Sequence, residues 1–399
     1  MTTAQLHYDP FDANIQDDPY PVYQQLRDDA PVFRAETANT WVLSRHEDVI
    51  PALLDHDTYS SVNGVFPTPP DAPFLESFLP MMITMDPPRH DQLRGLVSKA
   101  FTPRRIVALE TGIDELAASL VERLTSSGSE GRSDFVADLA GILPAVVIAD
   151  LLGIPREDRQ QFRQWSSTLI QSNPARGEVA EGLAAAAAVY AYFADFLADR
   201  RKAPRDDLMS ALVAAEIDGQ RLSDDELLGF CLLLLIAGHE TTTNLLANAA
   251  VVLAGHPRSR HRLAADPTLI GQAVEELLRY ASPVQGLSRV LTTDVTLHGA
   301  TMSQGDSVLL LFGSANRDER VFARPDVFDI DRKPEHQVAF GRGIHFCLGA
   351  ALARLEARIA LGALLSRLPD WAVDVDSAVR LRSGPIRGYL SLPIMWPAS

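Results

Sequence analysis

Cysteine is nearly absent from this chain, whose 399 residues include only Cys231 and Cys347. Two cysteines so far apart do not build the disulfide framework of a small secreted domain, and they favour a reducing cytoplasm. An excess of positive charge is also missing, since the formal net charge is −16 at pH 7. We therefore expect no nucleic-acid partner and no polybasic membrane surface.

A basic, apolar leader and long apolar runs are missing as well. The first 29 residues are acidic and interrupted by proline, unlike a secretory signal. The run CLLLLIA at 231–237 is much shorter than the roughly 20 residues that cross a bilayer, and Glu226, His239 and Glu240 flank it. These absences predict a cytoplasmic protein with no membrane segment.

Helical patterns dominate what is present. Hydrophobic residues make up 46% and charged residues 22% of the chain, as in an ordinary globular protein. Apolar residues recur at helical spacing over 106–128, and the alanine-rich stretch 182–202 also predicts a helix. Short strand-like stretches occupy 40–49, 289–299, 306–316 and 386–396. The pattern predicts a mainly α fold with small β-sheets.

The longest predicted helix begins after Ser223, which forms a capping-box pattern with Glu226. It can continue to Gly255 and Pro257, which end it. At about 1.5 Å per residue it would be roughly 45–50 Å long, so it must pass through the centre of the molecule.

The middle of this helix, AGHETTTN at 237–244, contains residues that weaken a helix. Gly238 costs about 1 kcal/mol relative to alanine, and the Thr241 hydroxyl can bond back to the Ala237 carbonyl. One interpretation is a helix crossing where small residues allow close packing. The other is function, because an acid such as Glu240 beside a distorted threonine can deliver protons.

Cations and one ion pair are the next candidates. His90 and Arg94 share a helix face, and Arg289 begins a predicted strand. If these side chains point inward they need an anion, whereas the alternative is ordinary surface charge. Glu276 and Arg279 lie at i and i+3 and can pair, which by itself indicates no more than a solvated ion pair.

The segment FGRGIHFCLG at 340–349 places Cys347 just before a predicted helix. It lacks the lysine and hydroxyl of a phosphate-binding loop and the further ligands of a zinc site. A catalytic nucleophile remains an alternative. A thiolate on a loop lined with N–H groups, at a helix N-terminus, suits an axial ligand to haem iron.

Together these segments resemble the cytochrome P450 family. FGRGIHFCLG is similar to its haem-binding loop, AGHETT to its oxygen-activation motif and Glu276–Arg279 to its Glu-x-x-Arg pair. The resemblance extends from DPYPVY near the start to SLPIMW near the end, and it implies one domain, 1–399, with the long central helix crossing over the haem. It also implies a monooxygenase that inserts one oxygen atom from O2 into a hydrophobic small molecule.

The resemblance assigns roles to individual positions. Cys347 would be the axial ligand of haem b, and Glu240 with Thr241 would relay protons. His90, Arg94, Arg289 and His345 would pair with the two haem propionates. The remaining haem contacts would be Ala237, Gly238 and Thr241 on the distal side and Phe340, Gly341 and Gly349 on the proximal side. Glu276 and Arg279 would form a buried structural pair, whose third member is Gln337, His336 or Arg332.

The resemblance also implies partners. Electrons would come from an external ferredoxin and its reductase, docked on cations of 86–105 and 332–358, including Arg104 and Arg105. We expect a monomer. The apolar substrate pocket would consist of Phe74, Phe78, Met81, Met82, Leu233, Ile236, Ala237, Gln285, Gly286, Leu287 and Ile386.

Two other activities remain open at this point. One is peroxide-driven oxidation, against which the Glu240–Thr241 pair argues. The other is a haem-binding sensor or carrier without turnover.

Overall fold

The computed structural model describes residues 6–62, 64–67, 79–127, 131–171, 179–216 and 219–397. The helices are α1 (Ala13–Asp17), α2 (Tyr20–Asp29), α3 (His46–Leu54), α4 (Arg89–Ala100), α5 (Pro103–Ala108), α6 (Glu110–Ser127), α7 (Leu143–Leu152), α8 (Arg159–Gln171), α9 (Val179–Lys202), α10 (Leu208–Ala214), α11 (Asp224–Gly255), α12 (Pro257–Ala265), α13 (Ile270–Tyr280), α14 (Phe312–Ala315) and α15 (Ala350–Arg367). The strands are β1 (Val32–Ala35), β2 (Thr40–Leu43), β3 (Tyr59–Ser60), β4 (Arg132–Asp134), β5 (Leu287–Leu291), β6 (Val295–Leu297), β7 (Ala300–Met302), β8 (Ser307–Leu310), β9 (Ala372–Val373), β10 (Val379–Arg380), β11 (Tyr389–Ser391) and β12 (Pro393–Met395). The prediction of a mainly α fold with small sheets is confirmed.

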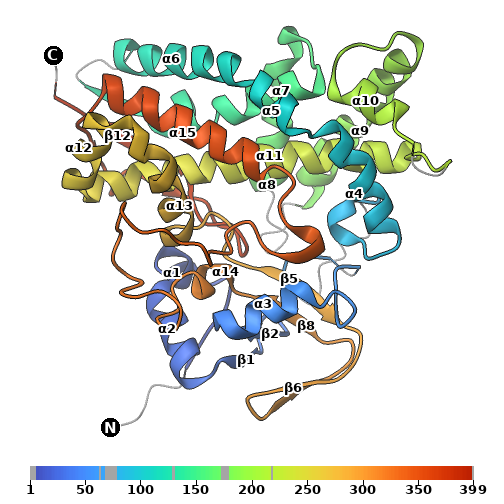
Figure 1. Cartoon of the computed structure of the whole chain (residues 1–399), viewed down its shortest axis with the longest axis vertical. Coiled ribbons are helices and arrows are strands. Elements are labelled where there is room, and N and C mark those ends of the chain that lie inside the picture. Colours follow the sequence, from blue (N-terminus) through green and yellow to red (C-terminus); the bar gives the residue numbers. More distant parts are fainter. Residues whose placement is uncertain are drawn as a thin grey trace.

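Helix α11 runs across the helical part of the molecule, with α15 and α6 on one side of it in the view of Figure 1. The predicted capping box is present: the Ser223 hydroxyl accepts from the Glu226 N–H at 3.2 Å, and the Ser223 N–H donates to Glu226 Oε2 at 2.8 Å. Glu226 also pairs with Arg89, which ties the start of α11 to α4. The main apolar core surrounds α11 and contains the inward faces of α6, α7, α9, α13 and α15.

The largest sheet lies at the other side of the molecule, beside α1, α2 and α3 (Figure 1). Its strand order is β1-β2-β8-β5-β3, with β2 and β8 parallel and the other pairs antiparallel. Arg289 of β5 is opposite Val308 of β8 in the register. The central strand β8 is buried at Val308, Leu309 and Leu310, so β5 is held firmly and its Arg289 side chain has a fixed position.

Several element boundaries differ from the sequence prediction. The predicted strand 40–49 ends at Leu43, and α3 begins at His46 because the His46 N–H donates to the distant Asp318 carboxylate at 2.9 Å. The predicted helix 106–128 is divided into α5 and α6 around Leu109. The predicted strand 306–316 ends at Leu310 and continues as the short helix α14.

The ion pair of α13 is completely buried. Arg279 donates to both Glu276 oxygens at 2.7 Å, and both side chains have no exposed surface. Arg332 supplies the third member, with its Nε 3.1 Å from Glu276 Oε1. Gln337 instead donates to Glu275, so its side chain does not complete this network.

Two described helices are long and apolar enough to cross a membrane by length and composition alone, which corrects the expectation that no segment reaches that length. In α11, 72% of the most apolar window is buried, as in the core helix of a folded domain. The corresponding value for residues 180–202 of α9 is 33%, and α9 packs on α8, α10 and α11.

Removing the charge of Glu276 should destabilise the fold strongly. We expect Glu276→Gln to lower the free energy of unfolding by about 3–5 kcal/mol, because the Arg279 guanidinium would remain buried without its counterion. Urea unfolding followed by circular dichroism measures this. Asp331→Asn is the matched control, since Asp331 pairs with Arg262 and both side chains are more than half exposed. This control should change stability by less than about 1 kcal/mol, and an equal loss in both variants would contradict the prediction.

Candidate active site

The centre of α11 opens onto accessible space. Ala237 is exposed and Gly238 and Thr241 are half-buried, although the helix around them is mostly buried. The Thr241 hydroxyl donates to the Ala237 carbonyl at 2.7 Å, as the sequence predicted. A Cβ on Gly238 would lie 2.5 Å from Ile148 of α7. A side chain at position 238 would press against Ile148, which agrees with the interpretation that small residues here allow close helix packing.

Glu240 is buried beside this opening, and Asn244 holds its carboxyl group. The Asn244 amide donates to Glu240 Oε1 at 2.9 Å and to the Glu240 carbonyl at 3.0 Å. Burial raises the pKa of Glu240 to about 7, and the hydrogen bond from Asn244 opposes this rise without cancelling it. A carboxyl group with this pKa exchanges protons readily at neutral pH.

Asn244 is itself fixed from the opposite side. Its side-chain oxygen accepts from the Tyr389 N–H of β11 at 2.9 Å. A Cβ on Gly388 would lie 1.7 Å from this oxygen, so only glycine fits at position 388. Strand β11 therefore sets the position of Asn244, and Asn244 sets that of Glu240. The sequence motif included Asn244, but nothing in it indicated this contact with residues far along the chain.

His239, inside the same motif, connects α11 to two other segments. Its Nδ1 lies 2.6 Å from the Ser166 hydroxyl of α8, and its Nε2 lies 2.9 Å from the Gly141 carbonyl. Burial lowers the pKa of His239 to about 4, so the ring is neutral at pH 7. The two partners define the tautomer of the neutral ring: Nε2 carries the hydrogen and donates to the Gly141 carbonyl, and Nδ1 accepts from the Ser166 hydroxyl. His239 thus fixes the rotation of α11 next to the acid.

The cysteine loop lies between a single 3-10 turn, Gly343–His345, and the start of α15. The Cys347 N–H donates to the Phe340 carbonyl at 3.0 Å, which closes the loop. Burial raises the pKa of the Cys347 thiol, whereas a hydrogen bond from the Gly349 N–H and the charges of Arg94 and Arg354 act in the opposite direction. The sulfur is half-buried in a setting that offers hydrogen bonds to a thiolate.

Four basic side chains from three segments converge beside this loop. The rings of His90 and His345 are 4.3 Å apart, and Arg94 donates to the Phe346 carbonyl at 2.7 Å. Burial lowers the pKa of Arg289 to about 10. Burial and the neighbouring charges of Arg289, His90 and Arg94 lower the pKa of His345 to about 3. With a pKa of about 3 the His345 ring is neutral at pH 7 in the absence of an anion, so the positive charge here comes from Arg94 and Arg289. These four side chains are the residues that the sequence predicted for the haem propionates.

The arrangement fits a large, flat, anionic group. His90 Nε2 is buried without a hydrogen-bond partner among the described residues, and the positive groups around it repel one another. A Cβ on Gly341 or Gly349 would meet nothing within 4 Å, so the cysteine loop borders open space. Exposed Ala237 faces accessible space from α11. An iron porphyrin with two carboxylates matches the unsatisfied His90 Nε2, the guanidinium groups of Arg94 and Arg289 and the thiolate donor.

The expected substrate pocket is described only in part. Phe74 and Phe78 lie outside the described residues. Leu233 and Ile236 are half-buried on α11, in the turns before Ala237. Gln285 differs from the expectation: its amide donates to the Ser282 carbonyl at 2.6 Å and its oxygen accepts from the Tyr23 hydroxyl at 3.2 Å. Its side chain is therefore used inside the protein core.

Many cations of the expected docking face have acidic partners. Arg89 pairs with Glu226, Arg105 with Asp206, Arg332 with Glu276, Arg354 with Glu275 and Arg358 with Glu110. Arg342 donates to the carbonyls of Glu335 and Gln337. With Lys333, Arg342 and Arg354 border a hollow of about 310 Å³ whose lining includes Phe346 of the cysteine loop. Fewer unpaired positive charges are therefore available to bind a redox partner than the sequence suggested, and they occupy a smaller area.

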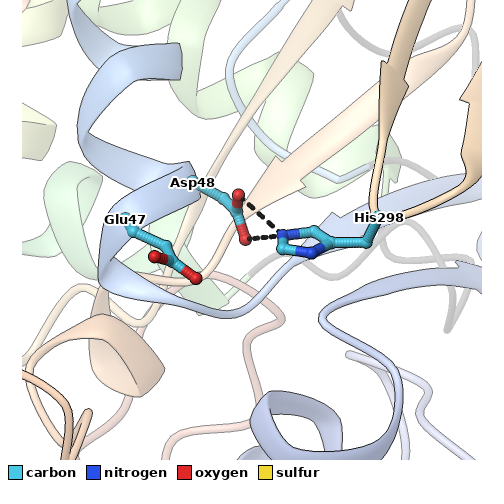
Figure 2. Close-up of side chains that lie close together, drawn as sticks. All are labelled: Glu47, Asp48 and His298. Atoms are coloured by element: carbon cyan, nitrogen blue, oxygen red, sulfur yellow. Dashed lines mark hydrogen bonds and ion pairs between the residues drawn. The ribbon is translucent and has the colours of Figure 1, made fainter.

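Sequence reasoning did not identify a second cluster, which lies far from the cysteine loop in the sequence. Figure 2 shows His298 pointing at the Asp48 carboxylate, with Glu47 beside them. His298 Nε2 is 2.9 and 3.0 Å from the two Asp48 oxygens, and Glu47 pairs with Arg45. Because each group already has a protein partner, the cluster joins α3 to the β6–β7 hairpin and gives no evidence of a bound metal.

The comparisons with known proteins agree with this geometry. Residues 14–374 match the family model described as cytochrome P450. A putative cytochrome P450 123 of Mycobacterium tuberculosis is 45% identical over 98% of this chain and 97% of its own length. A vitamin D(3) 25-hydroxylase of Pseudonocardia autotrophica is 41% identical over 100% of this chain and 99% of its own. The solved structure of cytochrome P450 CYP109Q5 from Chondromyces apiculatus has a TM-score of 0.90 at 37% identity, covering 99% of each chain.

The raised pKa of Glu240 makes a prediction about stability. Below its ordinary pKa of 4.5, the carboxyl is protonated in both the folded and the unfolded chain and has no effect. As the pH rises from 4.5 to about 7, only the unfolded chain ionises. Wild type should therefore lose about 3.5 kcal/mol in total relative to Glu240→Gln, at about 1.4 kcal/mol for each pH unit between the two pKa values, of which about 2.5 kcal/mol falls between pH 5 and pH 8.

Urea unfolding of both proteins at pH 5 and pH 8 measures this difference. Glu47→Gln is the control, because Glu47 is exposed and should show no comparable dependence on pH. A stability difference between wild type and Glu240→Gln that stays constant with pH would contradict the prediction.

Proposed function

The chain belongs to the cytochrome P450 family of haem-containing monooxygenases, and we propose that Cys347 is the residue that binds its haem iron. The protein is an oxidoreductase that inserts one oxygen atom from O2 into a hydrophobic organic molecule. The observation that carries the assignment of Cys347 is its place on a loop that borders open space, where the charge of Arg94 acts both on its thiol and on His345 of the basic group His90, Arg94, Arg289 and His345. The thiolate would donate electron density to the iron, and the cations would bind the two propionates.

Proton delivery is the task we propose for the centre of α11. Glu240, with a pKa of about 7, would take up and release protons, and Asn244 would hold its carboxyl group in place. The Thr241 hydroxyl donates to the Ala237 carbonyl, so its oxygen can accept a hydrogen bond from a water molecule that carries protons toward the oxygen site. This machinery supports dioxygen as the oxidant in place of added peroxide.

Several contacts of the remaining haem residues would be apolar. Ala237 would lie against the distal face, where a larger side chain would reduce the space for oxygen. Phe340, packed under the Arg354 guanidinium at 4.4 Å from its ring centre, would cover the proximal side near the sulfur. Gly341 and Gly349 would leave room for the porphyrin edge, since nothing lies within 4 Å of a Cβ at either position.

The substrate we propose is a neutral, hydrophobic molecule of about steroid size. The full-length similarity to a vitamin D(3) 25-hydroxylase supports this size class. The half-buried apolar side chains of Leu233 and Ile236 next to Ala237 support its apolar character. Among the described candidates of the pocket, Met81, Met82, Gly286, Leu287 and Ile386 add no charge.

Electrons come from a separate redox partner, as in the family, and we propose an acidic ferredoxin. It would dock at the hollow bordered by Lys333, Arg342 and Arg354, whose lining includes Phe346, the residue next to Cys347, and in which Glu275 and Glu335 offset part of the positive charge. We further propose that residues 1–399 form one domain that works as a monomer in the cytoplasm.

The carbon monoxide complex of the reduced protein tests the iron ligand. A thiolate-bound iron gives a strongly red-shifted absorption band, which we expect in wild type and not in Cys347→Ser. Cys231→Ala is the control, because Cys231 is buried on α11 with its sulfur 3.6 Å from Met209. It should keep the band, and a band retained by Cys347→Ser would disprove the assignment.

Replacing Thr241 tests the proton relay. In Thr241→Ala we expect product formed per NADH to fall by about tenfold, with the electrons released as peroxide or water, since general acid–base groups contribute roughly 10²–10⁴-fold. The assay contains a ferredoxin, its reductase and a turned-over substrate. Thr243→Ala is the matched control, because the Thr243 hydroxyl makes the same bond to a carbonyl four residues earlier, at 2.9 Å, but is buried. Equal coupling in Thr241→Ala and wild type would exclude this role.

A further inference from the structure

A second cavity lies at the C-terminal end of α11, away from the cysteine loop. Its volume is about 520 Å³, and its walls come from the chain around α2, the last turns of α11, the end of α13 and the β10–β11 hairpin. None of the residues assigned above to the haem or to proton delivery lines it. The cavity is therefore separate from the candidate active site.

Positive charge dominates the lining of this cavity. Arg317, Arg380 and Arg387 face Asp18 and Asp326. Asp326 forms an ion pair with Arg317 at 2.8 Å, and Asp18 is exposed to solvent. Arg380 and Arg387 therefore line the cavity without an ion pair to either of these aspartates.

Arg380 and Arg387 differ from their neighbours in making no direct ion pair, although the charge of Asp17 acts on Arg380 and Arg387 donates to the Asp17 carbonyl at 3.0 Å. In the described part of the chain, neither guanidinium lies within ion-pairing distance of a carboxylate, whereas the nearby Arg382 pairs with Asp17 at 2.8 Å. Burial lowers the pKa of Arg380, and the charge of Arg387 lowers it further. The two guanidinium groups are therefore close enough to repel each other, and an anion between them would remove that repulsion.

Unmet hydrogen-bonding capacity lies in the same wall. Arg380 Nη1, Arg387 Nε and Asn248 Oδ1 are buried, and none has a hydrogen-bond partner among the residues that the structure describes. Asn248 is 97% buried on α11, and its amide is already used by the carbonyls of Ala281 and Arg387. Such groups are rare in folded proteins without a ligand or an ordered water.

Aromatic rings form the rest of the lining. The Arg380 guanidinium lies 4.2 Å from the ring centre of Tyr389, and Arg387 lies 5.4 Å from that of Tyr20. Arg317 is held between Tyr20 and Tyr280, at 3.7 and 3.8 Å from their ring centres. These rings fix the guanidinium planes and offer flat apolar surface to a ligand.

We propose that this cavity binds a small organic oxyanion with a flat apolar body, whose carboxylate or phosphate lies between Arg380 and Arg387. Guanidinium groups bind both kinds of oxyanion through paired N–H donors. The flat body of the ligand packs against the tyrosine rings that line the cavity. This site is independent of the haem and of the oxidised substrate.

Isothermal titration calorimetry of the haem-loaded protein tests the proposal, with benzoate and phenyl phosphate as probes at constant ionic strength set by chloride. We expect saturable binding of one molecule per chain. The tighter of the two probes identifies the preferred oxyanion. Acetate should bind at least about tenfold more weakly than benzoate, because it lacks the flat body, and tenfold corresponds to about 1.4 kcal/mol.

Charge-neutral variants locate the binding. Arg380→Gln/Arg387→Gln should weaken the preferred probe by at least about tenfold, whereas Arg382→Gln, which removes a paired arginine from the same segment, should leave it nearly unchanged. If the double variant does not fold, each single variant should still weaken binding several-fold. The proposal is overturned if neither probe binds saturably, if the arginine variants bind as wild type does, or if binding shifts the haem absorption equally in wild type and variants.

Discussion

The concentration of buried positive charge beside Cys347 constrains much of this molecule. His90, Arg94, Arg289 and His345 come from α4, β5 and the cysteine loop, and burial with the neighbouring charges keeps His345 neutral unless an anion lies among them. The scaffold must therefore hold three distant segments together. The Arg89–Glu226 pair fixes α4 on α11, and the register of β5 on β8 fixes Arg289. The contacts that hold α4, β5 and the cysteine loop together are therefore also the contacts that place the haem-binding side chains.

The sequence predicted those features that depend on local chemistry. The capping box at Ser223, the end of α11 near Gly255 and the bond from Thr241 to Ala237 all involve residues a few positions apart. Boundaries set by distant partners were wrong. Helix α3 begins where Asp318 caps His46, and a window of neighbouring residues contains no information about that contact.

The candidate site was predictable to a similar extent. The motif around Cys347 and the acid–threonine pair were identified directly, and the basic residues could be grouped once an anion was inferred. The positioning roles of His239 and Asn244 could not be predicted, because their partners lie on other elements. The expected docking charge was too large, because formal charge in a sequence segment does not show which arginines have acidic neighbours.

Glycine at position 388 has a consequence for altering this enzyme. Its backbone touches Asn244, so the hairpin that carries Ile386 cannot be redesigned independently of the helix that carries Glu240. Mutagenesis of the hairpin aimed at new selectivity would then change the efficiency with which electrons are used, even where no altered residue faces the oxygen. Variant libraries that keep glycine at position 388 should separate a change in selectivity from a change in electron use better than libraries that vary the whole hairpin.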